Sequence, residues 1–288
     1  MTDAPRHLAE ELAALWPPLL VAAERIAAGV AQGAHGRRRT GSGETFWQYR
    51  RSQPGDPLAA IDWRRSGRGD QLFLRETEWA AAQTVWLWCD ASPSMAWRST
   101  PALPTKRERA EVLILALAAL LLRGGERIAP LAGGMAPTGG GGALSRLADM
   151  LARERTGPGL PTPPPLPRHA TVVLAGDLLA PPEEIAALLG RLSAGGATGH
   201  LLQVLDPAEE SLPYDGRIRF EGLEGEGEML AGRAQDLRGA YAERLADHRA
   251  ALAALARARG WSFATHRTDQ PPQPALLGLY TQLAERPR

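Results

Sequence analysis

The stretch WLWCDASPSMAW, residues 86–97, passes directly from an apolar run into an acid and two serines. With the two residues before it, the apolar part forms TVWLWCD, Thr84–Asp90, which has the length and character of a strand buried on both faces. Asp90, Ser92 and Ser94 follow at the strand's end. They are hard oxygen ligands for a metal ion, but they are also common turn and helix-capping residues. The stretch therefore predicts a central strand, and it leaves two interpretations of the polar residues open.

Apolar strands and helices alternate from this stretch to the end of the chain. The predicted strands are 84–90, 127–133, 170–177, 199–206 and 261–268, and the predicted helices are 106–123, 143–155, 181–192, 234–259 and 274–286. Such alternation is typical of a parallel sheet covered by helices on both faces. We therefore predict a doubly wound, mostly parallel, Rossmann-like α/β domain over residues 81–288.

Two segments of different character precede this domain. Residues 1–35 have a helical pattern that a Pro-Pro pair interrupts. Residues 36–80 are rich in glycine, charge and aromatic side chains, with turn signals and short candidate strands at 45–49 and 71–76. We predict a helical segment followed by a small β-rich annex.

The composition excludes several classes of protein. With 33 basic and 32 acidic residues, the formal charge of +1 argues against a general nucleic-acid or acidic-membrane binder. Cys89 is the only cysteine, so no intramolecular disulfide can form and a reducing compartment is expected. The longest apolar run, Val112–Leu122, is shorter than the roughly 20 residues of a membrane span, and residues 1–18 lack a signal-peptide pattern. We expect a cytoplasmic protein without membrane insertion.

Two of the predicted strands end in aspartate, at Asp90 and Asp177. In open parallel sheets, ligands bind beyond the carboxyl ends of strands where the strand order reverses. If the two strands are neighbours there, both carboxylates and the hydroxyls of Ser92 and Ser94 face one crevice. That set of hard oxygen ligands suits Mg²⁺ or Mn²⁺. Turn formation or capping is the alternative explanation for each residue.

Three stretches carry a resemblance to known proteins. The D-x-S-x-S spacing of Asp90–Ser94 resembles the metal-ion-dependent adhesion site of von Willebrand factor A domains. Residues 41–68 and 241–283 also resemble a bacterial branch of that group, the domain of unknown function 58 family. In residues 41–68, the residues that match the family pattern are Gly41, Gly43, Phe46, Arg50 or Arg51, Pro54, Gly55, Asp56, Ile61, Asp62 and Trp63.

The resemblance implies roles for individual residues. Ser92 and Ser94 would contact the ion directly, with Asp90 and Asp177 supporting them through water. The family pattern also expects a third hydroxyl before the Asp177 strand, where this chain offers Thr138 early and Ser145 late in APTGGGGALSRL. The departure from the pattern leaves open a weak or vestigial site.

The annex motif has its own alternatives. Asp56 and Asp62, beside Arg50 and Arg51, could form a surface charge cluster that contributes little to stability. We favour a structural role instead, in which Trp63 holds the annex against the α/β core while its neighbours form ion pairs. That interpretation predicts that Asp62→Ala lowers stability.

The resemblance also implies a function. It indicates a non-enzymatic, metal-dependent protein-interaction module that works with a MoxR-type AAA+ ATPase in the assembly or maturation of another protein complex. The first alternative is a phosphatase-like hydrolase using Asp90 and Asp177, although the position two residues after Asp90 holds Ser92 instead of a second aspartate. No G-x-S-x-G elbow is present for a serine hydrolase. The run GGGGALSRL lacks the lysine of a phosphate-binding loop, which argues against nucleotide binding.

Overall fold

The computed structural model describes residues 22–23, 25–31, 46–51, 66–67, 71–77, 83–140, 142–154 and 156–284. Its main body is a five-stranded, fully parallel sheet with the order β4-β3-β5-β6-β9. The strands are β3 (Thr84–Cys89), β4 (Arg127–Pro130), β5 (Thr171–Gly176), β6 (Thr198–Leu205) and β9 (Ser262–Arg267). The predicted doubly wound α/β fold is confirmed.

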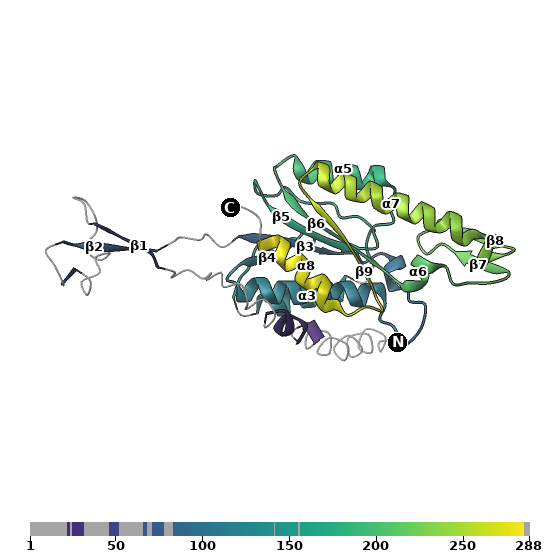
Figure 1. The fold of residues 1–288 in the computed structure, drawn as a ribbon, viewed down its shortest axis with the longest axis horizontal. Helices are drawn as coiled ribbons and strands as arrows, with labels where there is room; N and C mark the ends of the chain where they lie inside the picture. Colours follow the sequence, from purple (N-terminus) through teal and green to yellow (C-terminus); the bar gives the residue numbers. More distant parts are fainter. Residues whose placement is uncertain are drawn as a thin grey trace, which may run out of the picture.

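The helices cover the sheet on both faces (Figure 1). They are α3 (Lys106–Arg123), α4 (Ala143–Arg153), α5 (Pro182–Ser193), α7 (Arg238–Ala258) and α8 (Pro272–Ala284), with the short α6 (Pro207–Ser211) and the 3-10 helices η2 (Pro93–Ala96) and η3 (Ala234–Leu237). Helices α3, α4 and α8 lie on one face, whereas α5 and α7 lie on the other. Within the described ranges, no helix combines the length and apolar character that a bilayer span requires.

The strand order places the reversal point beside β3. The chain runs from β3 outward to β4 on one side, and then returns to lay β5, β6 and β9 successively on the other side. The carboxyl ends of β3 and β5 therefore border the crevice in which doubly wound proteins bind ligands.

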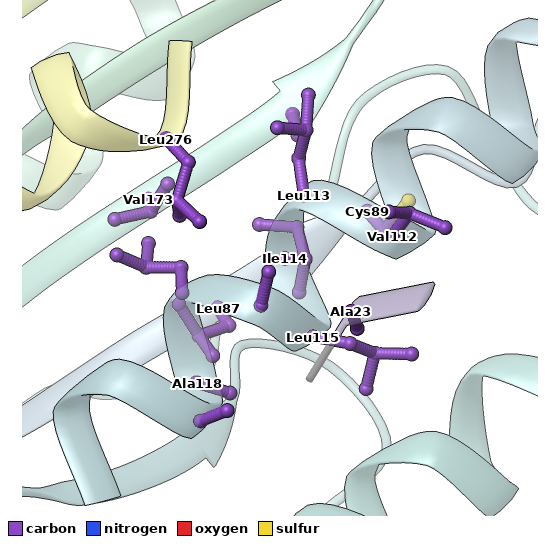
Figure 2. Close-up of a cluster of buried hydrophobic side chains, with 14 of the residues drawn as sticks. Ala23, Leu87, Cys89, Val112, Leu113, Ile114, Leu115, Ala118, Val173 and Leu276 are labelled. Carbon is purple, nitrogen blue, oxygen red and sulfur yellow. The ribbon is translucent and has the colours of Figure 1, made fainter. Parts of the chain in front are cut away.

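The apolar run that predicted β3 is divided between two cores. Leu87 and Cys89 face α3, while Trp86 and Trp88 face α5 and α7, because successive side chains of a strand point to opposite faces. Figure 2 shows Leu87 in the first core, close to Val173 of β5 and to the buried side chains of α3 and α8. Burial on both faces explains why the run has no polar alternation.

Helix α3 lies between the sheet and an outer layer. Its buried residues run without a break from Ala110 to Leu121, and they pack with the helical residues 25–31 as well as with α4 and α8. Thr105 starts the helix with a capping box, accepting from the Glu108 N–H while the Glu108 carboxylate accepts from the Thr105 N–H. These local signals explain why the predicted bounds 106–123 are confirmed to the residue.

Gly199 of β6 permits a close approach across the sheet. A Cβ at this position would lie 2.1 Å from the Val172 carbonyl oxygen and 2.6 Å from the Trp261 ring. We expect Gly199→Ala to lower the free energy of unfolding by about 2–3 kcal/mol, because the backbone cannot yield as a side chain does. At Gly195, the control, an added methyl group would meet no atom within 4 Å, so Gly195→Ala should be neutral or slightly stabilising in urea denaturation. Equal midpoints for the two variants would contradict the prediction.

Between β6 and α7, one short helix and two strands had no counterpart among the predicted elements. Asp206 opens α6 with a capping box to Glu209, a signal contained in the sequence DPAEE. An antiparallel hairpin of β7 (Ile218–Glu221) and β8 (Glu228–Ala231) then follows before α7. Its tip is the Gly- and Glu-rich run 222–227, which had no apolar period to indicate a strand.

The annex is described only in part. β1 (Phe46–Arg51) pairs antiparallel with β2 (Phe73–Thr77), close to the predicted strands, and the hairpin stands apart from the α/β body in Figure 1. Arg50 and Arg51 belong to β1, and Arg51 is exposed. Asp56, Asp62 and Trp63 lie outside the described residues, so the structural role of the motif stays a prediction.

Candidate metal centre

Asp90 and Asp177 meet at the reversal point of the sheet. Strands β3 and β5 pair up to Cys89 opposite Ala175, and the Asp90 N–H continues the ladder by donating to the Ala175 carbonyl at 2.8 Å. Both aspartates are buried, Asp90 completely. The sequence pattern placed them at equivalent strand ends, and the structure brings them close together at the ends of the paired strands β3 and β5.

The loop after β3 brings both serines to the aspartates. The Ser92 N–H donates to Asp90 Oδ1 at 2.8 Å, which folds the loop back over the strand end. The Ser94 hydroxyl donates to Asp177 Oδ2 at 2.5 Å, and the Ser92 and Ser94 hydroxyl oxygens are 3.2 Å apart. Ser92 stands at the N-cap of η2, yet its side chain makes no capping bond. Capping therefore does not explain its hydroxyl.

The second carboxylate oxygen of Asp90 has no partner. Asp90 Oδ2 is buried without a hydrogen bond, a costly situation for an ionised group. Burial raises the pKa of Asp90 to about 7, and the nearby Asp177 carboxylate adds to this, while the Ser92 N–H opposes it. Such an oxygen in a protein interior is explained by a proton or by a cation that the site can take up.

Gly176 closes the crevice on the β5 side. A Cβ at this position would lie 2.7 Å from Asp90 Cβ and 2.9 Å from Asp90 Oδ2. The last residue of β5 therefore has to be glycine for the aspartate to fit against the strand.

Lys106 is a component of the centre that the sequence pattern did not predict. Its ammonium lies 3.0 Å from Asp177 Oδ2 and 2.5 Å from Glu209 Oε1, and the residue is 1% exposed. Burial by itself would lower the pKa of Lys106, but the two carboxylates outweigh it and raise the pKa, so the amine is held charged. The sequence holds one signal that could have pointed to this residue, which is that Lys106 is the only lysine in the chain.

A third strand end contributes to the same region. Asp206 follows β6 and is fully buried, accepting from the Ser99 N–H at 2.9 Å and from the Ala208 N–H at 2.8 Å. It thereby fixes both the loop beyond η2 and the start of α6, which presents Glu209 to Lys106. Burial raises the pKa of Glu209, and Lys106 opposes that effect.

Asp177 is held by its backbone as well. The buried Gln203 side chain donates to the Asp177 carbonyl at 2.9 Å and accepts from Arg249 at 2.7 Å. Arg249 also pairs with Glu210. The Leu179 N–H reaches the Asp177 Oδ1 at 3.3 Å. This network fixes the orientation of the carboxylate that Ser94 and Lys106 share.

The two candidates for a third hydroxyl lie elsewhere. Thr138 pairs with Ile128, which is opposite Val85 in the sheet, five residues before Asp90 along β3. Ser145 is exposed in the first turn of α4. Thr156, an exposed residue, directly precedes Gly157, whose N–H donates to the Ala91 carbonyl in the Asp90–Ser94 loop at 3.1 Å. The sequence signal for it is the run TGPG that follows α4.

The donor set fits a hard divalent cation. Two carboxylates and two hydroxyls converge, and with Asp90 ionised the charges of Asp90, Asp177, Glu209 and Lys106 leave a net −2. Over the described ranges, no group of three or more His, Cys, Asp or Glu side chains is spaced to hold a metal, so a cation here would need the serine hydroxyls as well.

The arrangement does not favour hydrolysis. The Ser94 hydroxyl donates to the Asp177 carboxylate, and among the described residues no histidine is bonded to it; His248 Nε2 lies 2.8 Å from the Leu178 carbonyl instead. Asp90 is fully buried, and Ser92 occupies the position where a phosphatase of the expected class has its acid. Ser94 therefore has no imidazole base in these contacts, and no second aspartate stands two residues after Asp90.

The fold and the crevice define a doubly wound α/β protein with a polar, hydroxyl-lined centre at the reversal point of its sheet. The chain belongs to the family described as "Protein of unknown function DUF58", whose model matches residues 48–251. A search of curated proteins found no match. Among solved structures, the chain is similar to an uncharacterized membrane spanning protein from Vibrio fischeri, at 15% identity over 71% of this chain and 100% of that one. The TM-score of 0.19 does not establish a shared fold.

Proposed function

We propose that this protein is a metal-dependent protein-interaction module, in which Asp90, Ser92, Ser94 and Asp177 hold Mg²⁺ or Mn²⁺. The observation that supports it most is the unpartnered, buried Oδ2 of Asp90 beside two hydroxyls and a second carboxylate. A hard cation supplies the missing partner and offsets the net −2 charge. Ser94 is only partly buried, so a ligand from outside can approach the ion on that side.

The ligand from outside is a carboxylate of a partner protein. A cation bound by neutral hydroxyls and buried carboxylates leaves its exposed side free for one more anionic oxygen. The proposed partner is a MoxR-type AAA+ ATPase acting in assembly or maturation of another complex in the cytoplasm. Thr156 is our candidate for the third hydroxyl, because its neighbour Gly157 is bonded to the Asp90–Ser94 loop.

Isothermal titration with Mg²⁺ and Mn²⁺ tests the centre. We expect the wild type to bind one ion and Ser92→Ala/Ser94→Ala to bind about tenfold more weakly or worse, because two ligands are lost. Ser145→Ala is the matched control, since it removes an exposed serine hydroxyl outside the crevice. Absence of binding in the wild type, or equal binding in both variants, would overturn the proposed metal centre.

The partner is tested separately. A pull-down from the native cell, with and without chelator, should recover an AAA+ ATPase only when the metal is present. Hydrolysis of p-nitrophenyl phosphate that is abolished by Asp90→Asn would instead favour the phosphatase alternative.

A further inference from the structure

The β7–β8 hairpin places a carboxylate at the entrance of the centre. Glu224, at its tip, accepts from the Ser94 N–H at 3.4 Å. A Cβ added at Gly159 would lie 3.6 Å from the other oxygen of Glu224 and 4.0 Å from Ser92 Cβ. Glu224 also contributes, after burial and Asp177, to the raised pKa of Asp90. A residue 130 positions away in the sequence from Ser94 thus reaches the side of the centre that is open to solvent.

The tip has a defined conformation of its own. The Gly222 N–H donates to the Gly227 carbonyl at 2.8 Å, and Glu226 Oε2 accepts from the Glu224 N–H at 2.9 Å. Gly225 and Gly227 adopt φ of 96° and 89°, which other residues rarely do. These bonds hold the backbone of the tip that carries Glu224, and residues 222–227 are all exposed.

We propose that Glu224 is an internal carboxylate ligand that covers this centre and is displaced when a partner's carboxylate binds. The inference rests on the proposed function, and it concerns the regulation of the same site. Charge supports it. A divalent cation neutralises the net −2 of Asp90, Asp177, Glu209 and Lys106, so one additional carboxylate is accommodated at the open side, and a second would meet direct repulsion. Glu224 and a partner therefore compete.

The β7–β8 hairpin carries exposed apolar side chains and is only weakly bonded to the centre. Leu223, Met229 and Leu230 are about half exposed, and they are three of the large apolar side chains that the described part of the chain leaves in solvent. Among the hydrogen bonds of the described residues, one long bond, of 3.4 Å, joins the tip to the centre. A protein that brings a carboxylate to the ion and covers these side chains gains apolar burial in exchange for a weak internal contact.

Hydrogen exchange of the full-length, metal-free protein tests the cover. We expect Glu224→Ala to raise the exchange rates of peptides spanning 92–97 and 222–227 by about fivefold, the equivalent of the roughly 1 kcal/mol of one hydrogen bond. Glu228→Ala is the matched control on the same hairpin, since its carboxylate pairs with Arg219 and not with the centre. Equal exchange in wild type and Glu224→Ala overturns the proposal.

Mn²⁺ then tests the competition. The relaxation rate of water protons near bound Mn²⁺ should be higher in Glu224→Ala than in the wild type, because a water molecule replaces the carboxylate. Added acetate should reverse this increase, and it should have this effect in the Glu224→Ala variant only. Unchanged relaxation in Glu224→Ala, with Mn²⁺ bound, overturns the ligand role. If no variant binds Mn²⁺ while exchange still accelerates in Glu224→Ala alone, the proposed function fails and the competition fails with it, but the hairpin contact stands.

Discussion

Asp90→Asn is expected to raise the free energy of unfolding of the metal-free protein by about 2–4 kcal/mol at pH 8. The wild type has to bury an ionised carboxylate whose Oδ2 has no partner. The pKa of Asp90 rises from 3.8 to about 7, which corresponds to roughly 4 kcal/mol, and relaxation around the charge reduces this figure. Asparagine keeps the shape and the acceptor for the Ser92 N–H.

The difference between the two proteins should depend on pH. Because the pKa of Asp90 is higher in the folded than in the unfolded chain, its contribution to stability is fully present below about pH 3.8 and is lost as the pH rises through about 7. Wild type and Asp90→Asn should therefore unfold alike near pH 4, diverge progressively between pH 4 and pH 7, and differ by a constant amount above pH 7. Asp247→Asn, an exposed change on α7, is the control and should have little effect at either pH.

At pH 8, added metal should make the wild type more stable than Asp90→Asn. Millimolar Mg²⁺ stabilises the wild type by binding the folded state, whereas Asp90→Asn lacks the charge that holds the ion. Urea denaturation at pH 4 and pH 8, with and without Mg²⁺, measures all four conditions. A wild type that is more stable than Asp90→Asn at pH 8 without metal would contradict the argument from burial.

Lys106→Met should have the second large effect: we expect it to lower the free energy of unfolding by about 3–5 kcal/mol. Methionine fills a similar volume but leaves Asp177 and Glu209 without the ammonium that they share. Removing one partner of a buried ion pair strands the other charge in a poorly solvated place, which costs more than the pair contributes. Thermal and urea unfolding of the full chain measure the loss.

A double variant separates charge from packing. Lys106→Met/Glu209→Gln removes one stranded carboxylate, so part of the lost stability should return. Arg219→Met breaks an exposed pair with Glu221 and should change little. A Lys106→Met protein as stable as the wild type, or a double variant less stable than the single one, would show that the buried charges are compensated by other groups.

Most of the fold could be predicted because its signals are local. Strand β3 is apolar throughout since both faces are buried, and α3 carries its capping box at Thr105 and Glu108. Helix α7 was predicted to begin at residue 234, but residues 234–237 form the 3-10 helix η3 and α7 starts at Arg238. The β7–β8 hairpin was missed because its strands have only four residues each, and although β7 (IRFE) alternates, β8 (EMLA) does not.

The centre could be predicted only where its residues follow strands. Asp90 and Asp177 end neighbouring strands, so sheet topology brings them together. Lys106 and Glu224 reach the centre from a helix start and a hairpin tip, and no spacing in the sequence relates them to Asp90. Thr138 was a candidate by its position along the chain, but its pairing with Ile128 places it toward the opposite end of β3.

The buried Lys106 has a practical consequence. It is the only lysine among 288 residues, so this chain has a single side-chain primary amine, and that amine lies between Asp177 and Glu209 at 1% exposure. An amine-reactive reagent can acylate this side chain only when the crevice opens. The rate of labelling at this one position, followed by mass spectrometry, therefore reports how often the centre opens in the protein without substitutions.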